Sequence, residues 1–127
     1  MAPKILLVDD DVLMHRLYRR YIERAGYQLL TAETGVEAVE LAVRELPGVI
    51  IMDIMMPDMD GFSAIREIKR HPEAKGIPFI VITANPEYYV SQQESEWAGA
   101  MIFLTKPFGQ SSLVSAIQRV LPLKGPS

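Results

Sequence analysis

The sequence contains no cysteine and no apolar run long enough to cross a membrane. Without cysteine there is no disulfide framework, no thiolate metal site and no cysteine nucleophile, a composition that suits a reducing compartment. The first residues, MAPKILLVDDD, contain only a short apolar run before three aspartates, so they predict neither a signal peptide nor a membrane span. We therefore expect a cytoplasmic protein that is not attached to a membrane.

The net charge of the sequence is also low. A formal charge of -3 gives no support for nucleic-acid binding through bulk charge. The apolar fraction of 49% and the charged fraction of 23% are typical of a globular domain rather than a disordered or fibrous chain. Because 127 residues accommodate one hydrophobic core, we expect one domain over residues 1–122 and a loose tail over residues 123–127.

Short runs rich in Ile, Val and Leu alternate with longer stretches whose apolar residues recur every three or four positions. The short runs predict strands that are buried on both faces, as in a parallel sheet, over residues 5–8, 28–31, 49–52, 79–83 and 101–104. The longer stretches predict five helices, of which the fourth, over residues 86–98, has the least regular pattern. Five strand–helix units with short connections favour a three-layer, doubly wound α/β fold with helices on both faces of the sheet.

Two features of the predicted helices are specific enough to check. The first helix has an apolar face of six residues: Met14, Leu17, Tyr18, Tyr21, Ile22 and Ala25. Thr34 with Glu37 three residues later predicts the start of the second helix, and Asp60 is a suitable cap for the third.

Polar side chains follow four of the predicted strands. In an open parallel sheet the functional site lies beyond the carboxyl ends of the strands, so these residues are expected to meet at one edge. They are Asp9, Asp10 and Asp11 after the first strand, Asp53 after the third, Thr83 at the end of the fourth and Lys106 after the fifth. Each fragment alone is a common turn or cap, and only their convergence predicts a site.

The acidic residues at this edge predict a metal site. Crowded carboxylates repel one another, and burying them without a partner costs several kcal/mol, so a cation is expected among them. Oxygen ligands without His or Cys favour a hard cation, and a small set of carboxylates that leaves room for water suits Mg²⁺ better than Ca²⁺.

Four sequence strings, KILLVDDD, VIIMDIMMPDMDG, PFIVITA and FLTKPF, make the chain resemble the receiver domain of bacterial response regulators, over residues 4–121. The resemblance implies a flavodoxin-like sheet with strand order 2-1-3-4-5 and a role in a two-component or phosphorelay system. It implies a signalling phosphoacceptor that catalyses its own phosphorylation and dephosphorylation rather than an ordinary enzyme. The implied partners are a histidine kinase or histidine phosphotransfer protein and a downstream protein target, with no direct binding of nucleic acid.

The resemblance also assigns roles to the acidic residues. Asp53 is the implied phosphoacceptor. Asp10 and Asp53 are the implied Mg²⁺ ligands together with the backbone carbonyl of Met55, while Asp9 assists through water. Asp11 lies one position beyond the acidic pair of the family, and we interpret it as a cap or loop residue. Pro57 and Gly61 are expected to shape a sharp turn after the acceptor. This turn either starts the third helix or also holds the Met55 carbonyl toward the metal, and both can be true.

The remaining implied roles concern the phosphoryl group. Lys106 pairs first with the acceptor and then with a phosphoryl oxygen. The hydroxyl of Thr83 and the backbone N–H of Ala84 bind other phosphoryl oxygens. Pro107 resembles the cis proline of the family, a form that occurs in about one X-Pro bond in twenty.

Signal output in the family couples the threonine to an aromatic residue on the last strand, and it involves the fourth helix and fifth strand. The matching aromatic residue here is Phe103, where tyrosine is common, so the hydroxyl is absent; the alternative is that Phe103 is static core. Arg16 and Arg20 lie on a basic stripe of the first helix and are candidates for kinase docking. The alternative for this stripe is an ordinary solvated face.

Three other functions compete with this interpretation. A haloacid-dehalogenase-type phosphatase requires a second acid two residues after its nucleophile, and Met55 occupies that place after Asp53. Asp11 does follow Asp9 at this spacing, but the rest of that family's pattern, including a cap and a later acidic strand end, is absent. A flavin-binding module of similar fold requires a phosphate-binding loop rich in Ser, Thr and Gly, whereas the first strand here leads into aspartates. A receiver that binds partners without phosphorylation is disfavoured because every residue of the phosphorylation pattern is present.

Overall fold

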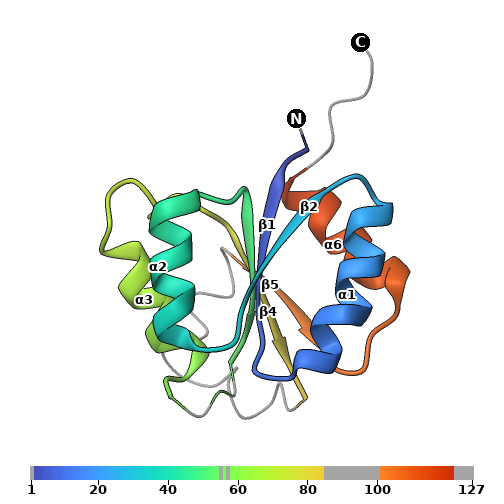
Figure 1. Ribbon diagram of the computed structural model, residues 1–127, viewed down its shortest axis with the longest axis horizontal. Helices are drawn as coiled ribbons and strands as arrows, with labels where there is room; N and C mark the ends of the chain where they lie inside the picture. Colours follow the sequence, from blue (N-terminus) through green and yellow to red (C-terminus); the bar gives the residue numbers. More distant parts are fainter. Residues whose placement is uncertain (1, 55, 57, 85–100, 122–127) are drawn as a thin grey trace.

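The computed structural model describes residues 2–54, 56, 58–84 and 101–121, and Figure 1 shows their arrangement around one central sheet. The sheet has five strands in the order β2-β1-β3-β4-β5, and every neighbouring pair is parallel. The strands are β1 (Lys4–Val8), β2 (Gln28–Ala32), β3 (Val49–Asp53), β4 (Phe79–Thr83) and β5 (Met101–Thr105). The predicted strand order is confirmed, and each predicted boundary lies within one residue of the observed one.

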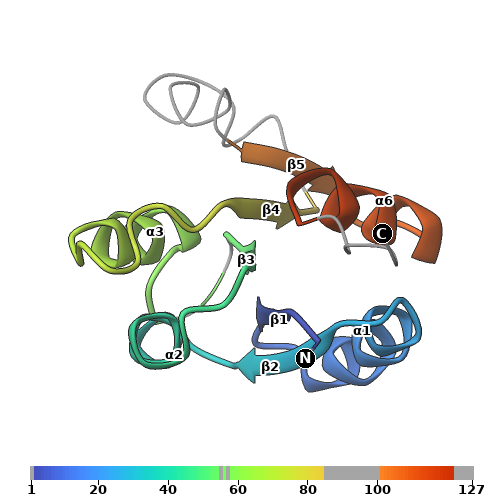
Figure 2. The same ribbon diagram turned by 90° about the horizontal axis from the view of Figure 1, so that it is seen from above.

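Four helices are described, and they form a layer on each face of the sheet. They are α1 (Val12–Arg24), α2 (Gly35–Glu45), α3 (Gly61–Lys69) and α6 (Gln110–Val120). Helices α1 and α6 cover one face, and α2 and α3 cover the other (Figure 2). The three-layer prediction is therefore confirmed. The predicted helix over residues 86–98 and the predicted tail over residues 123–127 lie outside the described residues.

The strands build a separate apolar core on each face because their side chains alternate in direction. Leu6 and Ile50 pack with the residues of α2 and α3, whereas Ile5 and Ile51 pack with those of α1 and α6. All five residues of β3 and all five of β4 are buried. This two-sided burial explains why the strands appear in the sequence as nearly continuous apolar runs.

One part of the predicted apolar face of α1 is wrong. Tyr18 and Ile22 are buried as predicted, but Leu17 is 37% exposed and His15 is buried in its place. Successive residues of a helix are rotated by roughly 100°, which carries Leu17 off the face centred on Tyr18. His15, three residues before Tyr18, returns to that face.

Side chains cap the helices just beyond the ends of the strands. Asp11 accepts a hydrogen bond from the N–H of Leu13, and Thr34 accepts one from Glu37. Asp60 accepts a hydrogen bond from the N–H of Ser63. The predicted caps of α2 and α3 are therefore confirmed. These caps stabilise the starts of the helices and hold the short loops that connect them to the preceding strands. Among the described residues, no helix has the length and apolarity needed to span a bilayer.

Gly61, the first residue of α3, has no space for a side chain. A Cβ atom there would lie 2.6 Å from the Cα of Ile54 and 2.8 Å from the carbonyl oxygen of Asp53. We expect Gly61→Ala to lower the free energy of unfolding by about 2 kcal/mol, because backbone atoms must move to admit the methyl group. Urea unfolding monitored by circular dichroism measures this change.

Gly76 provides the matched control. A Cβ atom at Gly76 would meet nothing within 4 Å, so Gly76→Ala is expected to change stability by less than about 0.5 kcal/mol. Equal unfolding free energies for the two variants would contradict the claim that backbone atoms leave no space for a side chain at Gly61.

Candidate functional site

The carboxyl ends of β1, β3 and β5 bring an acidic pair and a lysine together at the lower edge of the sheet in Figure 1. Asp53 is the last residue of β3, Asp9 directly follows β1, and Lys106 directly follows β5. Strand β4 separates β3 from β5, so the long side chain of Lys106 spans the end of β4. The N–H of Lys106 donates to the carbonyl of Thr83 at 2.8 Å, which holds its backbone on that strand end.

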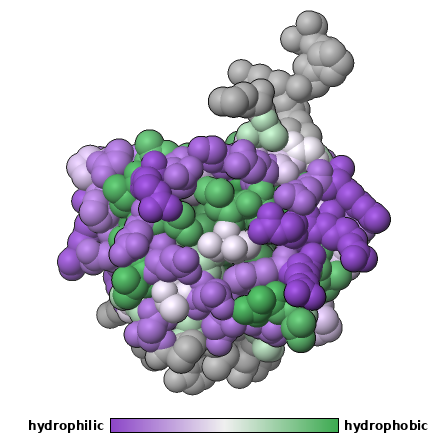
Figure 3. Space-filling view, viewed as in Figure 1, coloured by the Kyte–Doolittle hydropathy of each residue, from purple (hydrophilic) through white to green (hydrophobic). Residues whose placement is uncertain are grey.

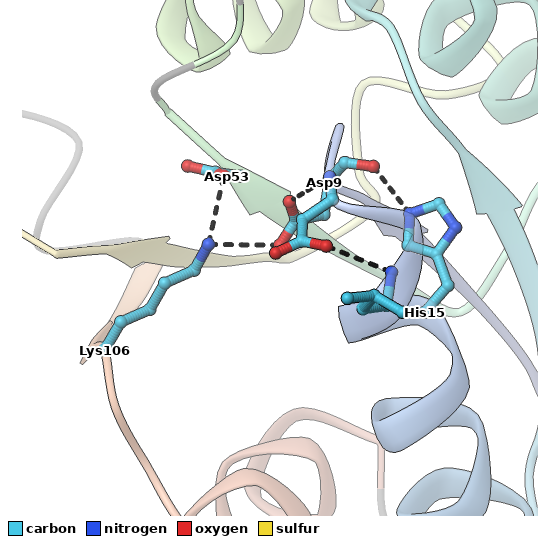
Figure 4. A network of polar contacts seen from close by, with 6 residues as sticks. Asp9, His15, Asp53 and Lys106 are labelled. Carbon is cyan, nitrogen blue, oxygen red and sulfur yellow. Dashed lines mark hydrogen bonds and ion pairs between the residues drawn. The ribbon is translucent and has the colours of Figure 1, made fainter.

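Lys106 forms two ion pairs at this edge. Its Nζ atom lies 3.1 Å from Oδ2 of Asp9 and 3.1 Å from Oδ2 of Asp53 (Figure 4). The side chains of Asp9 and Asp53 are 0% and 7% exposed, whereas the side chain of Lys106 is 23% exposed. The pair with Asp53 is the one that the resemblance implies. The equally short pair with Asp9 was not predicted.

The surrounding charges keep Lys106 protonated. Burial of Lys106 lowers its pKa, but the negative charges of Asp53 and Asp9 and their hydrogen bonds outweigh burial and raise the pKa above its usual value. The lysine is therefore a fixed positive charge at neutral pH.

Asp10 completes an acidic cluster with the two buried carboxylates. One carboxylate oxygen from each of Asp9, Asp10 and Asp53 lies within 4.8 Å of the others, and Asp10 is exposed to solvent. Three carboxylates against one lysine leave two negative charges in excess, which one divalent cation offsets. All the ligand atoms are oxygens, which suits Mg²⁺. The residues therefore fit the predicted metal.

An aromatic pair lies beside Lys106. The rings of Tyr18 on α1 and Phe108 stack with their centroids 5.2 Å apart and their planes at 16°. Burial raises the pKa of Tyr18, and the nearby charges of Lys106 and Asp9 act on it in opposite directions, so the phenol lies within the field of the site. The bond between Lys106 and Pro107 is cis, as the resemblance implies. The sequence pattern predicts Tyr18 on an apolar helix face, and it contains no signal for this stack.

Thr83 and Phe103 lie on the other face of the sheet from the α1 and α6 layer. Phe103 is partly buried against the α2 and α3 core, and Val81, its register partner on β4, belongs to the same core. Thr83 is two residues beyond Val81, so alternation directs it to the same face. Thr83 is 1% exposed at the strand end. The predicted switch residues therefore share one face on neighbouring strands.

Of the other predicted site residues, three are exposed and two lie outside the described residues. Ala84 directly follows β4 and is exposed, and Arg16 and Arg20 are exposed on α1. Met55 and Pro57 lie outside the described residues. His15, which sequence analysis did not single out, lies within hydrogen-bonding distance of the Asp9 carbonyl.

Comparisons with known proteins agree with this geometry. The chain is 36% identical to the protein PilH of Pseudomonas aeruginosa over 121 residues, which cover 93% of this chain and 97% of PilH. The structure of the chemotaxis response regulator CheY4 of Vibrio cholerae is 33% identical, with a TM-score of 0.84 over 95% of this chain and 100% of that chain.

A second solved structure and two longer curated proteins are also similar to this chain. The receiver domain of the sensor histidine kinase PA1611 of Pseudomonas aeruginosa is 31% identical, with a TM-score of 0.80 over 94% of this chain and 98% of that chain, and its structure has a magnesium ion in the active-site cleft. Two other curated relatives are longer, and this chain spans 27% and 48% of their length. The sequence model of the response regulator receiver domain matches residues 5–118, and this chain therefore belongs to the receiver domain family of two-component systems.

Proposed function

We propose that Asp53 accepts a phosphoryl group from a phosphohistidine donor. The observation that carries this proposal is the position of its carboxylate, which is paired with Lys106 and lies beside two further aspartates. The side chain of Asp53 is 7% exposed. The carboxylate oxygen of Asp53 forms a bond to phosphorus while the bond between phosphorus and the donor nitrogen breaks. The donor imidazole retains that electron pair, and the product is an acyl phosphate.

Asp10 and Asp53 would ligate Mg²⁺, with Asp9 assisting and the backbone carbonyl of Met55 as a further ligand. The fit of the three carboxylate oxygens and their excess charge supports this assignment. When bound, Mg²⁺ supplies positive charge that offsets the charge of the phosphoryl oxygens and orients donor and acceptor.

The chain supplies the other contacts to the phosphoryl group. Lys106 keeps its positive charge beside Asp53 and passes from the carboxylate to a phosphoryl oxygen. The Thr83 hydroxyl and the Ala84 backbone N–H bind the remaining oxygens. Attack of water on phosphorus then releases phosphate and restores the carboxylate, so the domain also removes its own phosphoryl group.

We further propose that output passes through Thr83 and Phe103. Their common face on adjacent strands supports movement of the aromatic ring when the threonine is drawn toward the phosphoryl group. The implied contribution of the fourth helix falls outside the described residues. We assign the receiver unit to residues 1–122 and place it in the cytoplasm, on the cysteine-free composition.

The proposed function is tested by intact mass spectrometry after incubation with acetyl phosphate. In the presence of Mg²⁺ the chain should gain the mass of one phosphoryl group, and in the presence of a chelator it should gain none. A chain that remains unmodified with Mg²⁺ and acetyl phosphate would contradict the proposal.

The first half of α1 has the composition of a surface that binds another helix. Val12 is 51% exposed and Leu13 is 69% exposed; Arg16 is exposed one turn further along α1, and Arg20 is exposed one turn beyond Arg16. Figure 3 shows an apolar area over this part of α1, at the lower right and bordered by polar residues. We propose that this surface docks the histidine-bearing partner, because it lies next to Asp9 and Asp10.

We expect the double variant Arg16→Ala with Arg20→Ala to slow phosphoryl transfer from a protein donor by about tenfold, because charged surface residues steer association. The rate with acetyl phosphate should stay the same, since a small donor needs no helix surface. Radiolabel transfer from a phosphorylated kinase measures the first rate and intact mass the second.

A control with the same charge change and residue spacing is available on α3 and its C-cap residue. Arg66 and Arg70 are exposed on the opposite face of the sheet, so replacing both with alanine should leave both rates unchanged. Equal slowing of the protein and small-molecule donors by the α1 variant would contradict the docking assignment.

A further inference from the structure

His15 is a buried polar side chain next to the acidic cluster. It lies on α1 with 8% exposure, and its Nε2 atom is 2.5 Å from the backbone carbonyl oxygen of Asp9 (Figure 4). The proposed phosphoryl transfer does not involve this contact. A buried imidazole that makes a hydrogen bond to the backbone beside a metal site can fix the orientation of that backbone.

The partner atom identifies which ring nitrogen carries a proton. A carbonyl oxygen only accepts hydrogen bonds, so Nε2 of His15 must be the donor in this contact. The imidazole thus acts on Asp9 through an N–H group, and another side chain with an N–H at the same place can substitute for it.

This bond completes the set of contacts that fix Asp9. Its N–H donates to the carbonyl of Ala32 at 3.1 Å, Oδ1 accepts from the N–H of Asp11 at 2.9 Å, and Oδ2 accepts from Lys106 at 3.1 Å. His15 engages the remaining polar atom, the carbonyl oxygen. Every polar atom of Asp9 is therefore held.

The carbonyl of Asp9 has a direct consequence for Asp10. The same planar peptide unit contains the carbonyl of Asp9 and the N–H of Asp10, so a fixed carbonyl also fixes the plane that leads into Asp10. Asp10 is the exposed member of the acidic cluster, whereas Asp9 and Asp53 are held by burial. His15 thereby joins helix α1 to the one peptide that connects two of the three carboxylates.

We propose that His15 is a positioning residue of the metal site. Its Nε2–H holds the peptide between Asp9 and Asp10 in the orientation that directs both carboxylates to Mg²⁺. This inference rests on the proposed function, because it assumes that the acidic cluster binds Mg²⁺.

The test compares two replacements of His15 in their affinity for Mg²⁺, measured by NMR titration of backbone amides. His15→Leu fills the buried space with an apolar side chain but removes the N–H donor. It is expected to weaken Mg²⁺ binding by about tenfold, in the range typical of lost outer-sphere contacts. His15→Gln retains an N–H donor at a similar reach, and its dissociation constant should stay within about threefold of the wild-type value.

A third variant separates positioning from a general loss of stability. Ile22→Val removes one buried methyl group from the same helix, at a cost of about 1 kcal/mol, without a change near Asp9. It should bind Mg²⁺ as the wild type does. Urea unfolding in chelator shows whether each variant is folded and by how much it is destabilised.

Two results would overturn the inference alone: wild-type affinity in His15→Leu, or an equal loss of affinity in His15→Gln and His15→Leu. Failure of the wild-type chain itself to bind Mg²⁺ would overturn the proposed function, and this inference with it.

Discussion

The variant Asp53→Asn should not become phosphorylated by acetyl phosphate and Mg²⁺. The amide has nearly the same shape as the carboxylate but lacks the anionic oxygen that attacks phosphorus, so incorporation should fall at least about a thousandfold. The fold should persist, because Lys106 keeps its ion pair with Asp9 at 3.1 Å. Intact mass spectrometry over time measures the loss.

Asp11→Asn is the matched control for this prediction. Asp11 is adjacent to the acidic cluster, but its carboxylate caps α1 through the N–H of Leu13, and asparagine caps helices equally well. This variant loses the same charge and should still be phosphorylated. Modification of Asp53→Asn at the wild-type rate would contradict the assignment of the acceptor and would mean that another residue accepts the phosphoryl group.

The variant Lys106→Met should lose both stability and phosphorylation. Removal of the Lys106 side-chain amine leaves two buried carboxylates, those of Asp9 and Asp53, without their ammonium partner. Breaking a fully buried pair costs roughly 3–5 kcal/mol, and because Lys106 is 23% exposed we expect a smaller loss of about 2 kcal/mol in chelator. Since Mg²⁺ brings positive charge to the same carboxylates, saturating Mg²⁺ should restore much of the lost stability.

The pH dependence of this stability difference has a defined sign. The folded-state pKa of Lys106 is raised, so its contribution is fully present below the unfolded-state pKa and is lost only as pH rises through the folded-state value. The difference between wild type and Lys106→Met should therefore stay constant between about pH 6.5 and 8.

Lys75→Met is the control for the loss of one positive charge at an exposed position. It should leave the unfolding free energy within about 0.5 kcal/mol of the wild-type value. If Lys106→Met were as stable as Lys75→Met in chelator, the ion pairs would not hold the site together as described.

The fold could be predicted from the sequence because its strands are buried on both faces. Continuous apolar runs such as residues 49–52 mark strands of a parallel sheet, and the carboxyl ends of such strands must meet at one edge. This topological rule is sufficient to bring Asp9, Asp53 and Lys106 together without knowledge of any side-chain conformation.

The contacts that depend on helix rotation and side-chain reach could not be predicted in the same way. His15 is buried on α1, whereas Leu17, which was predicted to be buried, is exposed. This difference depends on the rotation of the helix about its axis, which apolar periodicity defines only loosely. The ion pair between Lys106 and Asp9 depends on how far a flexible side chain extends past β4. The stack of Tyr18 on Phe108 joins residues 90 positions apart in the chain.

The rival functions differ from the receiver domain in particular residues. A haloacid-dehalogenase-type phosphatase needs an acid two residues after its nucleophile, and that position is Met55. The match to the receiver family over residues 5–118 also separates this chain from that enzyme class. A receiver that binds partners without phosphorylation predicts no mass change in wild type.

The most direct test of the account is to locate the phosphoryl group itself. Reduction of the acyl phosphate with borohydride marks the modified aspartate, and peptide mass spectrometry then identifies its position. The account predicts a mark at Asp53, present with Mg²⁺ and absent with chelator. A mark at Asp9 or Asp10, or modification of Asp53 that is independent of Mg²⁺, would contradict it.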